Sequence, residues 1–287
     1  MVQFGALLSS ASRRLDRLLV LAVVPFLVGL ASPGNFARVA ADTSTFRFGV
    51  SFGFPSAVAT AWDFVSLPNP GSGFTVYPPA LSAPQGVALV VASAVLTGVL
   101  AALYLGALRQ DLLGDGGGAS DRFRHVPALV GFELLVLAAV LGLVALAAVS
   151  IVLVIPGLVV ALYLAYRFYP TPYLVVLQGR GLGDALRSSR TLSARGGAYT
   201  SFFVRYLLAV AVISLVATPL FTTSVAGAVA GTALLAPVCV LFNAATMLFL
   251  ADPVGSGAST TGAPDGWDPD ARAIQSSSSS SNSPVDM

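Results

Sequence analysis

Long apolar runs separated by short polar segments make up most of this chain, and the length of these runs predicts its architecture. A membrane-spanning helix needs roughly 20 predominantly apolar residues to cross the hydrocarbon core of a bilayer. We therefore predict an all-α membrane protein, in which residues 1–251 form a six-helix transmembrane bundle and residues 252–287 form a disordered tail rich in Ser and Asp. The six helices are expected at about residues 11–31, 85–108, 126–149, 152–169, 200–221 and 225–250.

The third and fourth helices come from one almost unbroken apolar stretch, residues 126–168. At a rise of about 1.5 Å per residue, this stretch is far too long for a single crossing. We expect the chain to turn near Val149–Val152. Pro156 would then lie in the first turns of the returning helix, where proline is tolerated.

The first apolar run is short, and two interpretations of it remain open. It covers residues 18–31 and follows three arginines, so a spanning helix must begin near Ala11. A basic segment before a short apolar core is also typical of a cleaved signal peptide. We favour the helix, because Asp16 and Arg17 occupy positions that are apolar in a twin-arginine signal.

Residues 32–84 form a loop rich in Gly, Pro and aromatic residues. Alternating apolar and polar positions over Phe46–Phe54 predict a strand, with Phe74–Tyr77 as its partner. A short helix over Ser56–Val65 would carry Trp62 between them. The loop is either a cap that binds a ligand or partner, or an aromatic flap at the membrane interface. We favour the flap, because Trp, Tyr and Phe are enriched at that interface.

Small residues recur at every fourth position of the second predicted helix, at Ala94, Gly98, Ala102 and Gly106. Residues with this spacing lie along one face of a helix. Small side chains on one face let a neighbouring membrane helix approach closely. The stripe therefore predicts a tight helix–helix contact.

The segment of residues 170–198 is polar and basic. We predict an amphipathic helix from Asp184 to about Ala194, because Asp favours a helix start and Gly196-Gly197 would end the helix. A basic helix of this kind fits the membrane interface beneath anionic headgroups. The candidate surface for lipids or a protein partner consists of Arg180, Arg187, Arg190 and Arg195.

The arginines also predict an orientation in the membrane. Six crossings place both termini on one side, together with twelve of the fifteen arginines. Arg38 and Arg47 fall on the opposite side, and Arg205 lies just inside the fifth helix. Cytoplasmic loops carry an excess of basic residues. We therefore expect a multi-pass protein of the cell membrane with both termini and residues 170–198 in the cytoplasm, and with the loop of residues 32–84 external.

Composition supports the membrane class and removes much chemistry from consideration. Charged residues make up 10% of the chain, against about 25% in an ordinary soluble domain. The single cysteine, Cys239, and the single histidine, His125, exclude an internal disulfide, a multi-cysteine metal site and a paired-imidazole site. No cofactor is expected. The net charge of +2, with arginines scattered at helix ends, gives no argument for nucleic-acid binding.

Four polar residues are candidates for an intramembrane cluster: Glu133, Arg167, Arg205 and Asn243. Glu133 is the only acid within a predicted helix, where a charge is costly and often functional. It is either part of a proton or ion relay, or a structural partner of Arg167 or Arg205. We favour the structural pair, since a second relay group is missing. Asn243, or a neighbouring helix, would satisfy the backbone carbonyl that Pro237 leaves free.

Residues 126–250 carry a resemblance to a known family. The sequence of residues 184–192 (DALRSSRTL), followed by Gly196 and Phe202-Phe203 and preceded by a hairpin with Pro156 near its turn, resembles the membrane domain attached to some glycerophosphodiester phosphodiesterases. Uncharacterised bacterial and haloarchaeal membrane families share this pattern. The phosphodiesterase chemistry of those relatives resides in a separate soluble barrel domain, so the resemblance implies the fold and not the activity.

Three functions follow from these observations, in decreasing order of support. The first is a non-catalytic membrane module that organises lipids or protein partners through its basic segment. The second is a small-solute or ion transporter or channel with a polar site around Glu133 and Asn243. The third is a membrane enzyme, which ranks lowest because the sequence contains no acid–base or metal constellation.

Overall fold

Membrane-length helices dominate the computed structural model, which describes residues 4–41, 49–67, 83–114, 119–221 and 223–252. Five helical segments are long and apolar enough to cross a bilayer. They are built from α5 (Ala83–Leu113), α7 (Val126–Val149), α8 (Ile151–Phe168), α11 (Ala198–Phe221) and α12 (Val225–Ala251). A bent pair of segments, Asp16–Leu30 and Gly34–Ala41, makes a sixth if it is counted as one span. The protein is therefore an all-α membrane protein.

Most of the membrane-length helices begin and end within two residues of the predicted positions, and polar caps explain some of these ends. The turn between α7 and α8 lies at Ser150, whose hydroxyl accepts a hydrogen bond from the Val152 amide (3.3 Å). Pro156 lies early in α8, as predicted. Ser224 caps α12 in the same way, accepting from the Gly227 amide (2.9 Å). Only α5 extends clearly further than predicted, to Leu113 instead of residue 108.

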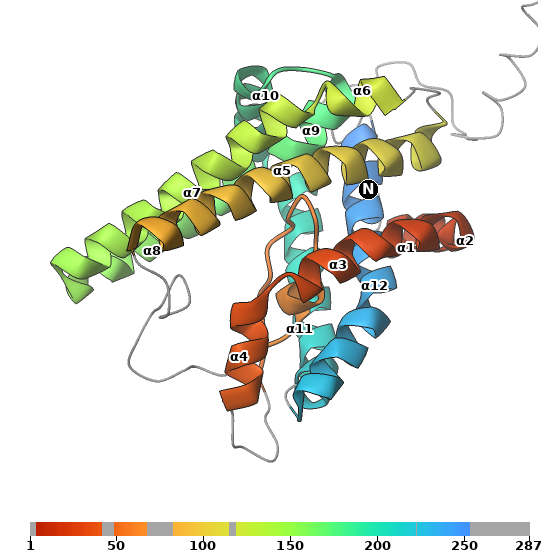
Figure 1. Ribbon diagram of the computed structural model, residues 1–287. Helices are drawn as coiled ribbons and strands as arrows, with labels where there is room; N and C mark the ends of the chain where they lie inside the picture. Colours follow the sequence, from red (N-terminus) through yellow and green to blue (C-terminus); the bar gives the residue numbers. More distant parts are fainter. Residues whose placement is uncertain (1–3, 42–48, 68–82, 115–118, 222, 253–287) are drawn as a thin grey trace, which may run out of the picture.

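The N-terminal region differs from the single helix predicted over residues 11–31. The chain forms a series of short helices instead: α1 (Phe4–Ser12), α2 (Leu15–Leu18), the 3-10 helix η1 (Leu19–Ala22), α3 (Val23–Leu30) and α4 (Pro33–Ala41). The helix breaks after Ser12, at Arg13-Arg14, and the Arg14 guanidinium donates to the Leu112 carbonyl at the end of α5. Figure 1 shows this series crossing α12. The predicted strand partner at residues 74–77 and the tail of residues 253–287 lie outside the described residues.

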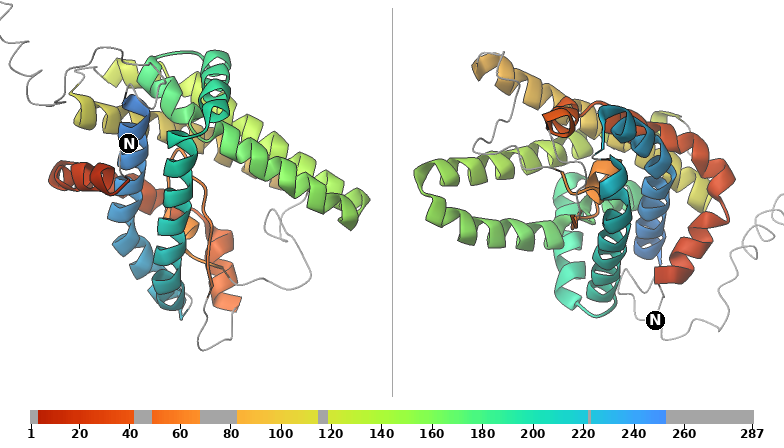
Figure 2. Two further views of the ribbon diagram at one scale, coloured as in Figure 1. Left: turned by 180° about the vertical axis from the view of Figure 1, so that it is seen from behind. Right: turned by 90° about the horizontal axis from the view of Figure 1, so that it is seen from below.

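Two groups of long helices run at an angle to each other. The antiparallel pair α11–α12 forms one group, and α5 runs obliquely to it with the α7–α8 hairpin (Figure 1). The hairpin reaches away from α11 and α12, as Figure 2 shows from two further sides. Its turn exposes large apolar side chains, with Val149 78% exposed and Val152 70% exposed. A surface of this kind is suited to the hydrocarbon of a bilayer.

The predicted stripe of small residues on α5 forms a close contact with α7. A Cβ atom added at Gly98 would lie only 2.6 Å from the Val130 Cα, and one added at Gly106 would lie 3.0 Å from the Arg122 Cγ. Ala102, between them, is fully buried. The prediction of a tight seam on this face is therefore confirmed.

The segment of residues 49–67, which we call the inserted loop, runs between helices instead of over their ends. The Ser51 amide donates to the Ser214 hydroxyl (2.8 Å), and the Ser66 amide donates to the Thr218 hydroxyl (3.0 Å). Trp62 is 8% exposed, and its indole donates to the Gly29 carbonyl (2.7 Å). These residues are therefore held among the helices, and their position relative to the membrane interface stays a prediction.

The local structure predicted for the inserted loop is confirmed only in part. Residues 49–54, the described part of the predicted strand, form no β-strand, because side chains of α11 take the hydrogen bond from Ser51 that a neighbouring strand would take. The predicted short helix exists as the 3-10 helix η2 (Ala61–Phe64), which carries Trp62. Thr60 and Asp63 close it with a capping box, in which the Thr60 amide donates to Asp63 Oδ2 (2.7 Å).

We predict that Gly98→Ala destabilises the protein although Ala favours helix formation. The added methyl group would overlap the α7 backbone, and overpacking of this kind costs about 1–3 kcal/mol. Gly142→Ala on α7 is the matched control, because a Cβ there meets nothing within 4 Å. Thermal unfolding in detergent would measure both variants, and equal midpoints for the two would contradict the seam.

Candidate functional site

Five helices meet at one end, on the side of the molecule where the chain enters α7. They contribute the C-terminal end of α5, the short helix α6 (Ala119–Phe123), the N-terminus of α7, and the turn between α9 (Thr171–Gln178) and α10 (Leu182–Arg195). Gly179, with φ +62°, ends α9 in a left-handed conformation that suits glycine. A Cβ there would lie 2.7 Å from Arg124 Nη2, so the Arg124 guanidinium lies directly against this turn.

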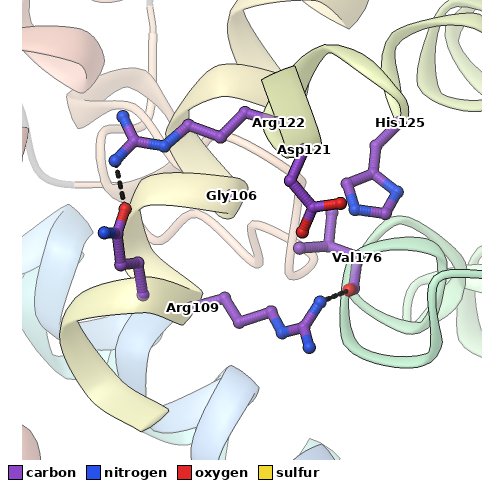
Figure 3. Close-up of a pocket in the computed structure, with 7 residues that line it drawn as sticks. Gly106, Arg109, Asp121, Arg122, His125 and Val176 are labelled. Carbon is purple, nitrogen blue, oxygen red and sulfur yellow. Dashed lines mark hydrogen bonds between the residues drawn. The ribbon is translucent and has the colours of Figure 1, made fainter. Parts of the chain in front are cut away.

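Two neighbouring cavities lie at this meeting point, and His125 lines both. The smaller has a volume of about 20 Å³, and Figure 3 shows the side chains around it. The larger, of about 430 Å³, opens to the outside between the start of α7 and the start of α10. The side chains that contribute positive charge are Arg109 and Arg122 in the smaller cavity, and Arg124 and Arg180 in the larger. We call this region the basic end.

Hydrogen bonds fix the walls of the smaller cavity. Arg109 Nη1 donates to the Val176 carbonyl on α9 (2.9 Å), and the Arg122 guanidinium donates to the Gln110 side chain (Figure 3). Arg122 Nε is buried and has no hydrogen-bond partner in the segments that the structure describes. Asp121 contributes the one carboxylate among the residues that line the cavity, and it pairs with Arg124 at 3.6 Å. The cavity therefore offers mainly hydrogen-bond donors.

Helix α10 extends the basic end along the outside of the protein. It packs through its small residues Ala185, Ser189 and Ser193, and the Ser189 hydroxyl donates to the Arg167 carbonyl at the end of α8 (2.6 Å). The four arginines predicted as a lipid or partner surface are all exposed: Arg180, Arg187, Arg190 and Arg195. The helix predicted over residues 184–194 is confirmed, and Gly196 and Gly197 end it with φ of +61° and +59°. Sequence reasoning missed α9, which is buried within the segment treated as polar.

The predicted intramembrane cluster is not assembled. Arg167 donates to the Tyr163 hydroxyl (2.7 Å) and lies 3.4 Å from the Ser193 hydroxyl, while Arg205 is exposed on α11. Glu133 is half-buried on α7, and no ion pair joins it to either arginine, all three residues being described. The structural pair favoured from the sequence is therefore absent.

Asn243 lies elsewhere, at the tip of the inserted loop, and is fully buried. Its amide nitrogen lies 3.3 Å from both the Ala57 carbonyl and the Tyr104 hydroxyl, and donates to each. The Tyr173 hydroxyl donates to the Ser56 carbonyl (2.8 Å) and lies 3.1 Å from Asn243 Oδ1. Asn243 thus forms its hydrogen bonds with the inserted loop and with tyrosine hydroxyls, and its amide does not reach the carbonyl freed by Pro237.

The inserted loop also brings Asp63, an acid that sequence reasoning placed in an external loop, against the helices. Burial raises the pKa of the Asp63 carboxyl to about 6, while its hydrogen bonds with Thr60 act in the opposite direction. The capping box around η2 gives this carboxyl a structural role. Among the described residues, no group of three or more His, Cys, Asp or Glu side chains is placed to hold a metal ion.

We predict that Tyr173→Phe loosens the inserted loop. Loss of the hydroxyl leaves the buried Ser56 carbonyl without this donor, which costs about 1–3 kcal/mol. Tyr163→Phe is the matched control, because Tyr163 is 53% exposed and its hydroxyl bonds only to Arg167 among the described residues. Hydrogen exchange should accelerate over residues 49–67 in Tyr173→Phe alone. Unchanged exchange there would show that the hydroxyl does not hold the loop.

Comparison with known proteins leaves the basic end to be interpreted from its own residues. No family model, no curated protein and no solved structure matches this chain.

Proposed function

We propose that this chain is a non-catalytic membrane module that binds anionic lipid headgroups, or a protein partner, through its basic end. The observation that carries the proposal is the concentration of arginines where α5, α6, α7, α9 and α10 meet. Four of them line the two cavities, and three more lie on the exposed face of α10. Basic pockets between membrane helices on the cytoplasmic side, and basic interfacial helices, are the usual sites for anionic headgroups.

The proposed orientation places the basic end in the cytoplasm. The positive-inside rule favours this side for clustered arginines near helix ends. Helix α10 would then lie at the headgroup level, with Ala185, Ser189 and Ser193 on the protein and its arginines towards phosphate groups. The resemblance to the membrane domain of glycerophosphodiester phosphodiesterases agrees with a module of this type, since the catalytic step of those relatives belongs to another domain.

The transporter alternative has less support. It requires a polar, hydrated site around Glu133 and Asn243, and neither residue lines the two cavities described above. The polar atoms of Asn243 are bonded to the inserted loop and to tyrosine hydroxyls. Solute flux into liposomes that is abolished by Glu133→Gln would favour the transporter over the lipid-binding module.

The double variant Arg187→Gln/Arg190→Gln should weaken binding of phosphatidylglycerol by about 30-fold, given roughly 1 kcal/mol for each arginine near an anionic surface. Native mass spectrometry of the detergent-solubilised chain would measure retention of phosphatidylglycerol against phosphatidylcholine. Arg38→Gln on α4, remote from the basic end along the chain, is the control and should bind as the unmodified protein does. Equal retention of the two lipids by the unmodified protein would refute the proposal.

A further inference from the structure

The larger cavity of the basic end is bordered by the N-termini of two helices. Leu182, Gly181 and Gly179 line it from the start of α10, and His125, Pro127 and Ala128 line it from the start of α7. The first backbone N–H groups of a helix have no partner within the helix. They also carry the positive end of the helix dipole, which makes such ends suited to anions.

Neither N-terminus is closed by a side chain. In α10 the first intrahelical bond runs from the Ala185 amide to the Gly181 carbonyl (3.1 Å), and Gly181 has no side chain to cap the helix. In α7 the first such bond runs from the Leu129 amide to the His125 carbonyl (3.1 Å), and the His125 side chain forms no capping bond. The amides of residues 182–184 in α10, and those of Val126 and Ala128 in α7, thus lack helical acceptors, whereas Pro127 has no N–H.

The turn into α10 is rich in glycine, and packing does not require two of its glycines, Gly181 and Gly183. Its sequence over residues 179–183 is Gly-Arg-Gly-Leu-Gly. The positive φ of Gly179 requires a glycine, but Gly181 has φ −68°, which any residue adopts. A Cβ added at Gly181 or Gly183 meets nothing within 4 Å. Glycines at such positions leave space for a ligand to approach the backbone closely.

His125 supplies the independent evidence that the cavity has an occupant. It is 4% exposed, lines both cavities, and its ring nitrogens have no hydrogen-bond partner among the described residues. The rest of the residue is buried, so its ring nitrogens can gain a partner only from a molecule that enters the cavities. In Figure 3, which shows the smaller cavity, the imidazole lies beside Asp121 and near Val176. An acceptor that enters the cavity would complete its hydrogen bonding.

The charged groups around the larger cavity favour an anion. Arg124 and Arg180 line it, and no carboxylate does. Arg180 is exposed and, within the described part of the chain, has no ion pair or hydrogen bond. Arg124 forms an ion pair with Asp121 at 3.6 Å. Asp184, in the first turn of α10, is engaged by Arg187 at 3.2 Å.

We propose that this cavity binds a single phosphate group, held by Arg124, Arg180, His125 and the backbone amides of residues 181–183. The guanidinium groups and helix N-termini would share its negative charge, and the glycines would allow it to reach the backbone. The inference rests on the proposed function in one respect, because the phosphate group would come from a lipid headgroup. It places the binding in the cavity and not on the exposed face of α10. A free phosphate ion offers the same chemistry.

The test uses the full chain in nanodiscs of phosphatidylcholine. Inorganic phosphate, short-chain phosphatidic acid and short-chain phosphatidylglycerol are titrated separately, and the shift in unfolding midpoint gives each apparent affinity. Arg180→Gln and Gly181→Ala should each weaken binding of phosphate-bearing ligands by about tenfold while leaving the unliganded midpoint unchanged. Arg190→Gln is the matched control, because Arg190 is an exposed arginine of α10 that does not line the cavity and, among the described residues, has no ion pair.

The outcomes separate the two proposals. Binding of inorganic phosphate that Arg180→Gln and Gly181→Ala weaken, and that Arg190→Gln does not, supports the cavity site. If the chain binds inorganic phosphate in this way but shows no preference for anionic lipids, the cavity site is supported and the proposed lipid function is refuted. Lipid binding that survives Arg180→Gln and Gly181→Ala but is lost in Arg187→Gln/Arg190→Gln overturns the cavity site and leaves the proposed function intact. Absence of binding in all three titrations overturns both.

Discussion

The need to satisfy backbone polar groups between membrane helices is the constraint on which most of this structure depends. A bilayer offers no water to an unpaired N–H or C=O, and a helix meets the demand internally. The inserted loop does not, so the neighbouring helices supply the partners. Ser214 and Thr218 of α11 accept from loop amides, and Tyr173 and Asn243 donate to loop carbonyls. The polar residues of these helices are thus explained by the loop that they hold.

This constraint also separates structural polarity from functional polarity. Asn243 is the most polar side chain within α12, yet its amide is used by the loop and by a tyrosine hydroxyl. At the basic end, by contrast, Arg180 and the imidazole of His125 lack partners among the described residues, and an open cavity lies beside them. Unused hydrogen-bonding capacity next to free space is what a binding site requires, and the region around Asn243 lacks it.

The sequence predicted the structure correctly where one physical rule acts on residues that are close together along the chain. Apolar length located α7, α8, α11 and α12 closely, and the spacing of small residues on α5 identified its contact with α7. It failed where the outcome depended on contacts distant along the chain. The alternation over residues 46–54 predicted a strand, but the acceptor for the Ser51 amide lies on α11, 163 residues away. The predicted pairing of Glu133 with an arginine likewise depended on the distance between residues far apart in the sequence, which no local pattern predicts.

The site was found only in part for the same reason. The exposed arginines of α10 could be predicted, since a basic amphipathic pattern places them on one face. The cavity could not, because it needs His125 and Arg124 from the start of α7 to lie opposite the glycine turn of residues 179–183. One signal was present in the sequence: Gly179 and Gly181 precede the start of α10 and Gly183 lies in its first turn, a pattern typical of anion-binding turns.

Helix α9 joins the inserted loop to the basic end, and its burial explains why the two form one unit. Tyr173 on this helix reaches the loop carbonyl of Ser56, and Val176, one turn later, accepts from Arg109 in the smaller cavity. Gly179 then turns the chain into α10 against Arg124. Because Thr171 to Val176 of α9 are buried, one short helix fixes the positions of the loop carbonyl, the acceptor for Arg109 and the start of the glycine turn relative to one another.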